Sequence, residues 1–94
     1  MLKESFVVIN GRASDERIRQ ALQEHDSLVI MKAGLARPRI LALLEETGRS
    51  GDARYLEYIG RDNERIVNQI DELANEAGPY FSLFVVIRQD RDRQ

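Results

Sequence analysis

The chain has 94 residues, which leaves room for one small domain and excludes two. Its 43% hydrophobic and 32% charged residues are typical of a folded protein, while a net charge of −2 gives no long-range positive field to gather nucleic acid or an anionic membrane. The sequence has no cysteine, which excludes disulfides and zinc–sulfur sites. It also has no stretch approaching the ~20 apolar residues of a membrane helix and no signal-peptide pattern, so we expect a cytoplasmic protein.

The first half of the chain alternates strand and helix patterns. Residues 5–9 (Ser-Phe-Val-Val-Ile) are β-branched and aromatic and are followed by Asn-Gly, which predicts a strand. Ser14 is placed to cap a helix over residues 15–24, where acidic residues come first. Residues 28–32 predict a second strand, apolar on both faces, and a second helix follows between Pro38 and Gly48. This alternation favours a layered α/β domain.

The second half is harder to assign from pattern alone. Residues 53–59 predict a third strand, with Tyr55, Glu57 and Ile59 on one face. Residues 65–77 carry apolar side chains at helical spacing, which by itself predicts a helix. Residues 81–87 are almost wholly apolar, as in a central strand buried on both faces, and the charged tail at residues 89–94 is expected to fray.

Few residues suggest chemistry that the chain could carry out alone. The single histidine, His25, lies at the end of the first predicted helix without a relay partner, so a solvated capping role is favoured over a catalytic base. Acidic pairs such as Glu45 and Glu46 are sequence neighbours on a helix and therefore point apart. No metal-ligand spacing occurs, and the six glycines lie at element ends without a phosphate-binding motif.

Three segments nevertheless resemble a known family. They are residues 26–34 (Asp-Ser-Leu-Val-Ile-Met-Lys-Ala-Gly), 55–67 (Tyr-Leu-Glu-Tyr-Ile-Gly-Arg-Asp-Asn-Glu-Arg-Ile-Val) and 78–88 (Gly-Pro-Tyr-Phe-Ser-Leu-Phe-Val-Val-Ile-Arg). Together they resemble the C-terminal domain of the tetrapyrrole methylases, with most similarity to the precorrin-2 and cobalt-precorrin-2 C(20)-methyltransferases. The resemblance implies a mixed, roughly five-stranded sheet with flanking helices. It also implies that residues 64–68 form an extended arm paired with the preceding strand and that only residues 71–76 are helical.

The family has two α/β domains with S-adenosylmethionine in the cleft between them. Because the chain resembles only the second domain, the resemblance implies a C-terminal half cut close to the interdomain linker at residues 1–3, whose missing partner is the N-terminal methylase domain. It further implies S-adenosylmethionine as the cofactor of the full-length protein, a precorrin-type tetrapyrrole as substrate, methylation of carbon 20 in cobalamin biosynthesis, and a homodimer. Half a cleft cannot place a methyl donor against a ring carbon, so we expect the isolated chain to be inactive and assign no catalytic residue.

The resemblance also implies four cofactor-binding residues. Met31 corresponds to the methionine that borders the cofactor, and Gly60 to a glycine that lets the backbone approach it. Phe81 and Ser82 belong to the run Tyr80-Phe81-Ser82, which matches the start of the last strand near the adenine. The residues alone allow other roles: Met31 and Phe81 could be core residues and Gly60 an ordinary turn.

Three basic residues lie beside these positions, at strand ends where open α/β sheets place ligands. They are Lys32, Arg37 and Arg61. Each could orient a carboxylate of a precorrin substrate or remain a solvated surface cation.

Two other functions stay open. One is another tetrapyrrole methylase acting at a different ring carbon, although the run at residues 78–83 favours the carbon-20 enzymes. The other is a stand-alone, non-enzymatic module that dimerises through a sheet edge or an apolar patch.

Overall fold

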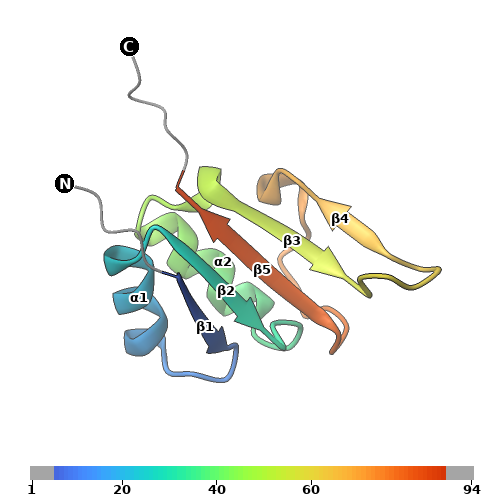
Figure 1. The fold of residues 1–94 in the computed structure, drawn as a ribbon, viewed down its shortest axis with the longest axis horizontal. Coiled ribbons are helices and arrows are strands. Elements are labelled where there is room, and N and C mark those ends of the chain that lie inside the picture. Colours follow the sequence, from blue (N-terminus) through green and yellow to red (C-terminus); the bar gives the residue numbers. More distant parts are fainter. Residues whose placement is uncertain (1–5, 89–94) are drawn as a thin grey trace, which may run out of the picture.

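A computed structural model describes residues 6–88, so the predictions for residues 1–3 and for the tail at residues 89–94 lie outside the described part of the chain. The fold consists of five strands and two α-helices (Figure 1). Their bounds are β1 Phe6–Asn10, α1 Asp15–Glu24, β2 Ser27–Met31, α2 Arg37–Glu46, β3 Ala53–Glu57, β4 Arg65–Val67 and β5 Ser82–Ile87. Two 3-10 turns, Ser50–Asp52 and Ile70–Glu72, precede β3 and follow β4. None of the helices in residues 6–88 is long and apolar enough to span a membrane.

The five strands form one mixed sheet in the order β1-β2-β5-β3-β4. β1 and β2 are parallel, whereas β5 is antiparallel to both β2 and β3, and β4 is antiparallel to β3. The last strand of the chain therefore lies at the centre of the sheet. This architecture confirms the predicted layered α/β domain with a mixed, five-stranded sheet.

The two helices lie where the sequence predicts them. α1 begins after Ser14, whose hydroxyl accepts a hydrogen bond from the Arg17 N–H. α2 carries Pro38 in its first turn, and Gly48 follows its end with a φ of +75°, a conformation that glycine adopts without strain.

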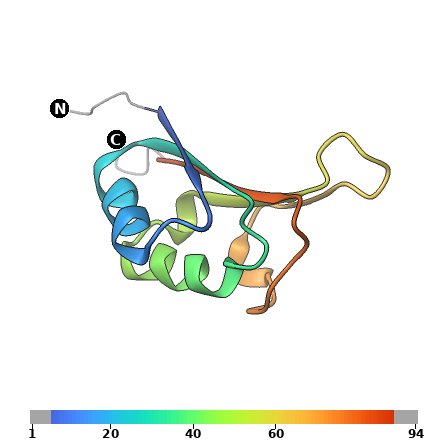
Figure 2. The same ribbon diagram turned by 90° about the horizontal axis from the view of Figure 1, so that it is seen from below.

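Both helices cover the same face of the sheet, so the domain has two layers (Figure 2). The covered face carries fully buried side chains from the three inner strands, including Leu28, Tyr55 and Phe84. We call the other side of the sheet the open face; its exposed apolar side chains are Phe6, Val8, Met31, Ile66 and Ile87. The prediction that residues 28–32 and 81–87 are buried on both faces is therefore wrong. Side chains alternate along a strand, and only every second one contacts the helical layer.

The region after β3 follows the family arm and not the helical pattern. β4 pairs with β3 through Tyr55 opposite Val67, which confirms the extended arm predicted at residues 64–68. The helix predicted at residues 71–76 is wrong, because only the 3-10 turn Ile70–Glu72 forms there. Leu73 follows this turn in an extended conformation and packs into the core, so a helix does not continue through it. Of the apolar side chains in residues 65–77, Ile70 and Leu73 are buried without a helix, whereas Ile66 is exposed on the open face.

β3 ends two residues earlier than predicted. Glu57 is its last residue, and Tyr58 then adopts a φ of +51°, which breaks the alternation of the strand. Ile59 is consequently exposed and does not share a face with Tyr55 and Glu57 as predicted.

Candidate functional site

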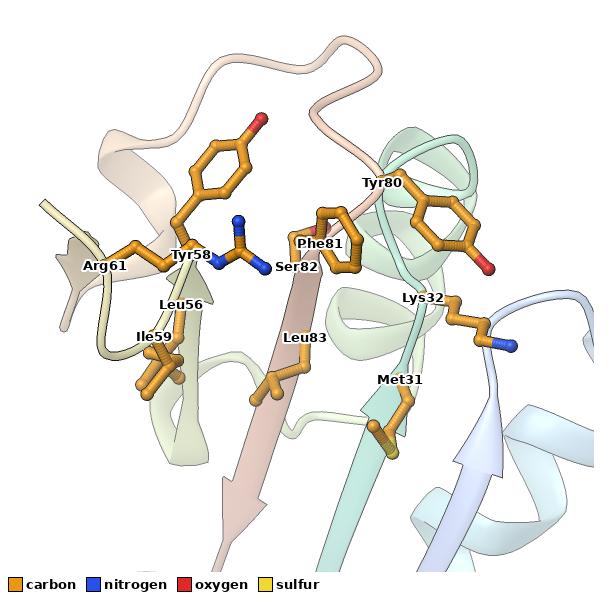
Figure 3. A pocket seen from close by; sticks show the side chains of 10 residues that line it. All are labelled: Met31, Lys32, Leu56, Tyr58, Ile59, Arg61, Tyr80, Phe81, Ser82 and Leu83. Carbon is orange, nitrogen blue, oxygen red and sulfur yellow. The ribbon is translucent and has the colours of Figure 1, made fainter. Parts of the chain in front are cut away.

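The candidate site lies at one end of the open face, where β2 and β3 end and β5 begins (Figure 3). A cavity of about 340 Å³ opens there. It is lined by Met31, Lys32, Leu56, Tyr58, Ile59, Arg61, Tyr80, Phe81, Ser82 and Leu83. Among residues 6–88, the lining combines apolar and aromatic side chains with two cations and contains no carboxylate. This size and composition are typical of small-molecule sites, which span about 300–1,000 Å³ and are lined mainly by apolar groups.

The register of the sheet builds the floor of this cavity. Met31 of β2 lies opposite Leu83 of β5, and Leu83 lies opposite Leu56 of β3. Because directly opposed residues point to the same face, these three side chains form one apolar row across the open face. The row places the end of β2 next to residues that are about 25 to 50 positions away in the sequence.

Backbone strain is concentrated at this cavity. Among residues 6–88, only Lys32 and Tyr58 have positive φ without being glycine, at +55° and +51°. Both line the cavity, and they directly follow β2 and β3, the two neighbours of β5. Such conformations cost about 1–3 kcal/mol each and cluster at functional sites. Their position therefore indicates that the functional site lies at this end of the sheet.

Aromatic rings form the wall above the floor. The Phe81 ring lies 5.2 Å from Tyr80 in an edge-to-face arrangement and 6.3 Å from Tyr58. The guanidinium of Arg61 lies 5.2 Å from the centre of the Phe81 ring. Phe81 is nevertheless 54% exposed and Met31 is 43% exposed. The structure therefore excludes the role of core residue for either side chain.

Three of the four predicted cofactor-binding residues meet in this cavity. Met31 and Phe81 present their side chains to it (Figure 3), and Ser82 also lines it. The Ser82 hydroxyl is buried and donates to the Pro79 carbonyl over 2.8 Å, so this side chain anchors the preceding loop.

Gly60 does not line the cavity, although its neighbours Ile59 and Arg61 do. Its φ is +81°, and its N–H donates to the Glu64 carboxylate over 3.0 Å. Turn geometry alone thus explains a glycine here. The predicted approach of this backbone to a ligand stays a prediction.

The loop that carries Tyr80 and Phe81 is fastened to the start of α2. The Gly78 N–H donates to the Gly34 carbonyl over 2.9 Å. Gly34 touches this loop so closely that a Cβ there would lie 2.0 Å from the Pro79 carbonyl oxygen. Only glycine allows such an approach, and this contact fixes the loop immediately before the aromatic wall.

A buried polar cluster supports the same loop from below. Arg37 is 4% exposed; it donates to the Glu76 carbonyl over 2.5 Å and to the Tyr55 hydroxyl over 3.1 Å. Tyr55 in turn donates to Glu57 over 2.8 Å, and the Arg37 and Glu57 charges lie 3.6 Å apart. Burial raises the pKa of the Tyr55 phenol above its usual 10.0, and the neighbouring Glu57 raises it further, while hydrogen bonds involving Ser82 and Arg37 oppose the rise.

Arg37 therefore fits neither of the two roles considered for it, orienting a ligand carboxylate from a loop or remaining a solvated surface cation. It belongs to α2, and its charge is directed into the interior. Lys32 and Arg61, the other two predicted cations, do line the cavity.

Comparison with solved structures supports the fold. Uroporphyrin III C-methyl transferase from Thermus thermophilus superposes with a TM-score of 0.66 at 19% identity, covering 92% of this chain and 41% of that one. A second structure of that enzyme, complexed with S-adenyl homocysteine, gives 0.63 at 20% identity and covers 92% of this chain and 42% of that one. The methyltransferase CobJ gives 0.67 at 17% identity and covers 90% and 41%. At these identities the likeness shows the fold alone.

Sequence comparison adds relatives at higher identity. Cobalt-precorrin-2 C(20)-methyltransferase from Salmonella typhimurium is 35% identical over 88 residues, which are 93% of this chain and 37% of that protein. Precorrin-2 C(20)-methyltransferase from Sinorhizobium sp is 32% identical over 79 residues, covering 84% of this chain and 32% of that protein. This chain is a tetrapyrrole methylase domain. No protein-family model matches the methylase domain, which spans only about a third of the length of these two relatives.

Sequence reasoning missed four lining residues of the methylase domain. They are Leu56, Tyr58, Ile59 and Leu83. Leu56 and Leu83 could have been found had the central position of the last strand been combined with its register. The turn at Tyr58 carries no such signal, since nothing in its sequence announces a positive φ.

Proposed function

We propose that this domain is the C-terminal half of an S-adenosylmethionine-dependent methyltransferase that methylates carbon 20 of precorrin-2 or cobalt-precorrin-2 in cobalamin biosynthesis. In this proposal the cavity beside Phe81 is one wall of the donor site, and an N-terminal methylase domain supplies the other wall. S-adenosylmethionine supplies the methyl group when it is bound. The cytoplasmic location expected from the sequence belongs to the same proposal.

The observation that carries the proposal is the position of the cavity. It joins Met31 and Phe81, the residues that the family resemblance assigns to the cofactor, at the one end of the sheet where non-glycine backbone strain occurs in residues 6–88. The exposed Met31 thioether and the Phe81 ring offer polarizable surfaces for an adenine or ribose. Methylation of carbon 20 is proposed from the names of the two relatives, which are both C(20)-methyltransferases. The Thermus structure complexed with S-adenyl homocysteine supports S-adenosylmethionine as the methyl donor.

Titration of the chain with S-adenosylhomocysteine, followed by ¹H–¹⁵N NMR, tests the donor site. We expect amide shifts at Met31, Phe81 and Ser82, with a dissociation constant at about millimolar or weaker because a half-site lacks much of the burial that ligand pockets supply. Phe81→Ala should abolish these shifts, whereas Phe6→Ala, which removes an exposed ring at the other end of the open face, should leave them unchanged. Shifts confined to other surfaces, or micromolar affinity, would contradict the half-site.

A homodimer is the second part of the proposal. In the part of the chain that the structure describes, five large apolar side chains are exposed on the open face, and β1 forms one edge of the sheet. Interfaces between domains bury roughly 600–1,500 Å², and an apolar face of this kind favours a partner over water. The same face favours the alternative of a non-enzymatic dimerisation module, which predicts a dimer without any response to S-adenosylhomocysteine.

A further inference from the structure

A second cavity adjoins the first on the other side of Lys32 and Tyr80, the two residues that line both. It has a volume of about 220 Å³ and lies where the parallel strands β1 and β2 end and α2 begins. Its remaining lining residues are Gly11, Arg12, Leu35, Ala36 and Arg39. In Figure 3 the Lys32 side chain points away from Phe81, toward the loop that follows β1. The two cavities are therefore neighbouring parts of one surface.

The second cavity carries positive charge that no described carboxylate balances. Within residues 6–88, five basic side chains make no ion pair, namely Arg12, Arg17, Lys32, Arg54 and Arg61. Arg12 and Lys32 line this cavity, Arg61 lines the first one, and neither lining includes an acidic residue from the described part of the chain. Cations gathered around a concave surface without counter-charges attract an anion.

Arg39 lines the same cavity but has a different role. Its guanidinium donates to the Gly11 carbonyl over 2.8 Å and to the Ala13 carbonyl over 3.0 Å, and it pairs with Asp15. Its charge and donors are thus used to hold the loop after β1 against α2. That loop carries Arg12, so Arg39 fixes the backbone on either side of Arg12.

Lys32 provides a second, independent observation. It holds a φ of +55°, where a glycine would be free of strain, and its ammonium lies 5.9 Å from the centre of the Tyr80 ring. Lys32 also lines both cavities, so its ammonium lies at the boundary between them. A carboxylate would complement it through charge-assisted hydrogen bonds.

We propose that the second cavity is a carboxylate-binding subsite, in which Arg12 and Lys32 hold a carboxylate of a ligand that occupies the first cavity. The proposal rests on the donor site proposed above. Two ligands of that site bring carboxylates: the amino-acid end of the methyl donor and the side chains of a tetrapyrrole substrate.

NMR titrations of the full chain with three probes separate these sources. S-adenosylhomocysteine carries the donor carboxylate, 5′-methylthioadenosine lacks it, and uroporphyrin supplies tetrapyrrole carboxylates. If the donor fills the subsite, the amides of Gly11 and Arg12 shift with S-adenosylhomocysteine but not with 5′-methylthioadenosine. If the substrate fills it, they shift only with uroporphyrin. Either result supports the subsite and identifies its source.

Substitutions then test the two cations. Arg12→Gln and Lys32→Gln should each weaken binding of the responding probe about three- to tenfold, because each removes one partly solvated charge-assisted bond. Arg17→Gln, which removes an exposed, unpaired cation that lines neither cavity, should leave the affinity unchanged. The Lys32 substitution keeps a non-glycine residue at the strained position, and the amide spectrum reports directly whether each variant folds.

Two failures are distinguishable. If the amides of Met31 and Phe81 respond to 5′-methylthioadenosine but those of Gly11 and Arg12 respond to no probe, or if Arg12→Gln behaves as Arg17→Gln does, the subsite is wrong and the donor site stands. If neither cavity responds to any probe, both proposals are overturned.

Discussion

Gly34→Ala should damage the candidate site without touching a residue that lines the donor cavity. Gly34 lies beyond the end of β2, and a Cβ there would be 2.0 Å from the Pro79 carbonyl oxygen and 2.6 Å from that of Gly78. Both atoms belong to the backbone, so no side chain can rotate away. To reach 3.4 Å, the short end of ordinary contact, the Pro79 oxygen must retreat by about 1.4 Å.

The size of the effect follows from these contacts. Overpacking of a well-packed site costs about 1–3 kcal/mol, and the retreat also breaks the hydrogen bond from Gly78 to Gly34, worth about 1 kcal/mol. A loss of about 2–4 kcal/mol lowers the Tm of a domain of this size by roughly 10–30 °C. Because the displaced loop continues into Tyr80 and Phe81, binding of S-adenosylhomocysteine should fall along with stability.

Thermal unfolding followed by circular dichroism, together with the amide spectrum, measures both effects. Gly48→Ala is the matched control. Its φ is +75°, so alanine is strained there by about 1–2 kcal/mol, but the added Cβ meets no atom of a packed neighbour within 4 Å. The control should lower the Tm and leave the amides of Tyr80 and Phe81 in place. If Gly34→Ala lowers the Tm by less than about 5 °C and leaves those amides unmoved, the loop is not held by this contact and the reasoning fails.

Four further predictions concern the buried cluster and the isolated chain. Arg37→Met should lower the free energy of unfolding by about 3 kcal/mol in urea titration, because Glu57 loses its buried partner; a loss under about 1 kcal/mol would contradict this. Because the pKa of Tyr55 is raised, the folded state retains a proton that the unfolded state loses above pH 10.0. The contribution of Tyr55 to the free energy of unfolding should therefore be constant below that pH and fall above it, and an equal alkaline fall in Tyr55→Phe would refute this cause. The purified chain should form no methylated product from precorrin-2 and S-adenosylmethionine, and detection of product would exclude the half-site. Light scattering should give a two-fold dimer, and a strict monomer well above micromolar concentration would remove that prediction while leaving the family unaffected.

Local signals in the sequence were sufficient for most of the secondary structure. α1 matches its predicted bounds because Ser14 caps it and an apolar stripe faces the sheet, both of which can be read from neighbouring residues. The arm at β4 could not be found in this way, because residues 65–77 fit a helix equally well. Only the family resemblance indicated that residues 64–68 pair with the preceding strand, and the structure adds the register, with Val67 opposite Tyr55.

The candidate site was only partly predictable, for a physical reason. Met31 and Phe81 follow from the resemblance, but the cavity that joins them depends on the order in which the strands pair. Arg37 shows the limit most clearly. A cation beside a strand end is usually solvated, and only the packing of α2 against β3 turns this one inward, onto Tyr55 and Glu57.

The strain beside β5 indicates that the site is formed before any ligand binds. Lys32 and Tyr58 lie on either side of the first residues of β5, and hydrogen bonds fix the backbone next to them: the Tyr58 N–H donates to the Phe81 carbonyl and the Ala33 N–H to the Ser82 carbonyl. The sheet therefore holds both residues in their unfavourable conformations, so a ligand need not supply the ordering free energy. Affinity of the isolated domain is then limited by missing contact area and not by reorganisation. An N-terminal methylase domain should thus strengthen ligand binding without changing the shape of this cavity. The backbone at Met31, Leu56 and Leu83 should therefore have the same conformation in the full-length enzyme as in the isolated domain.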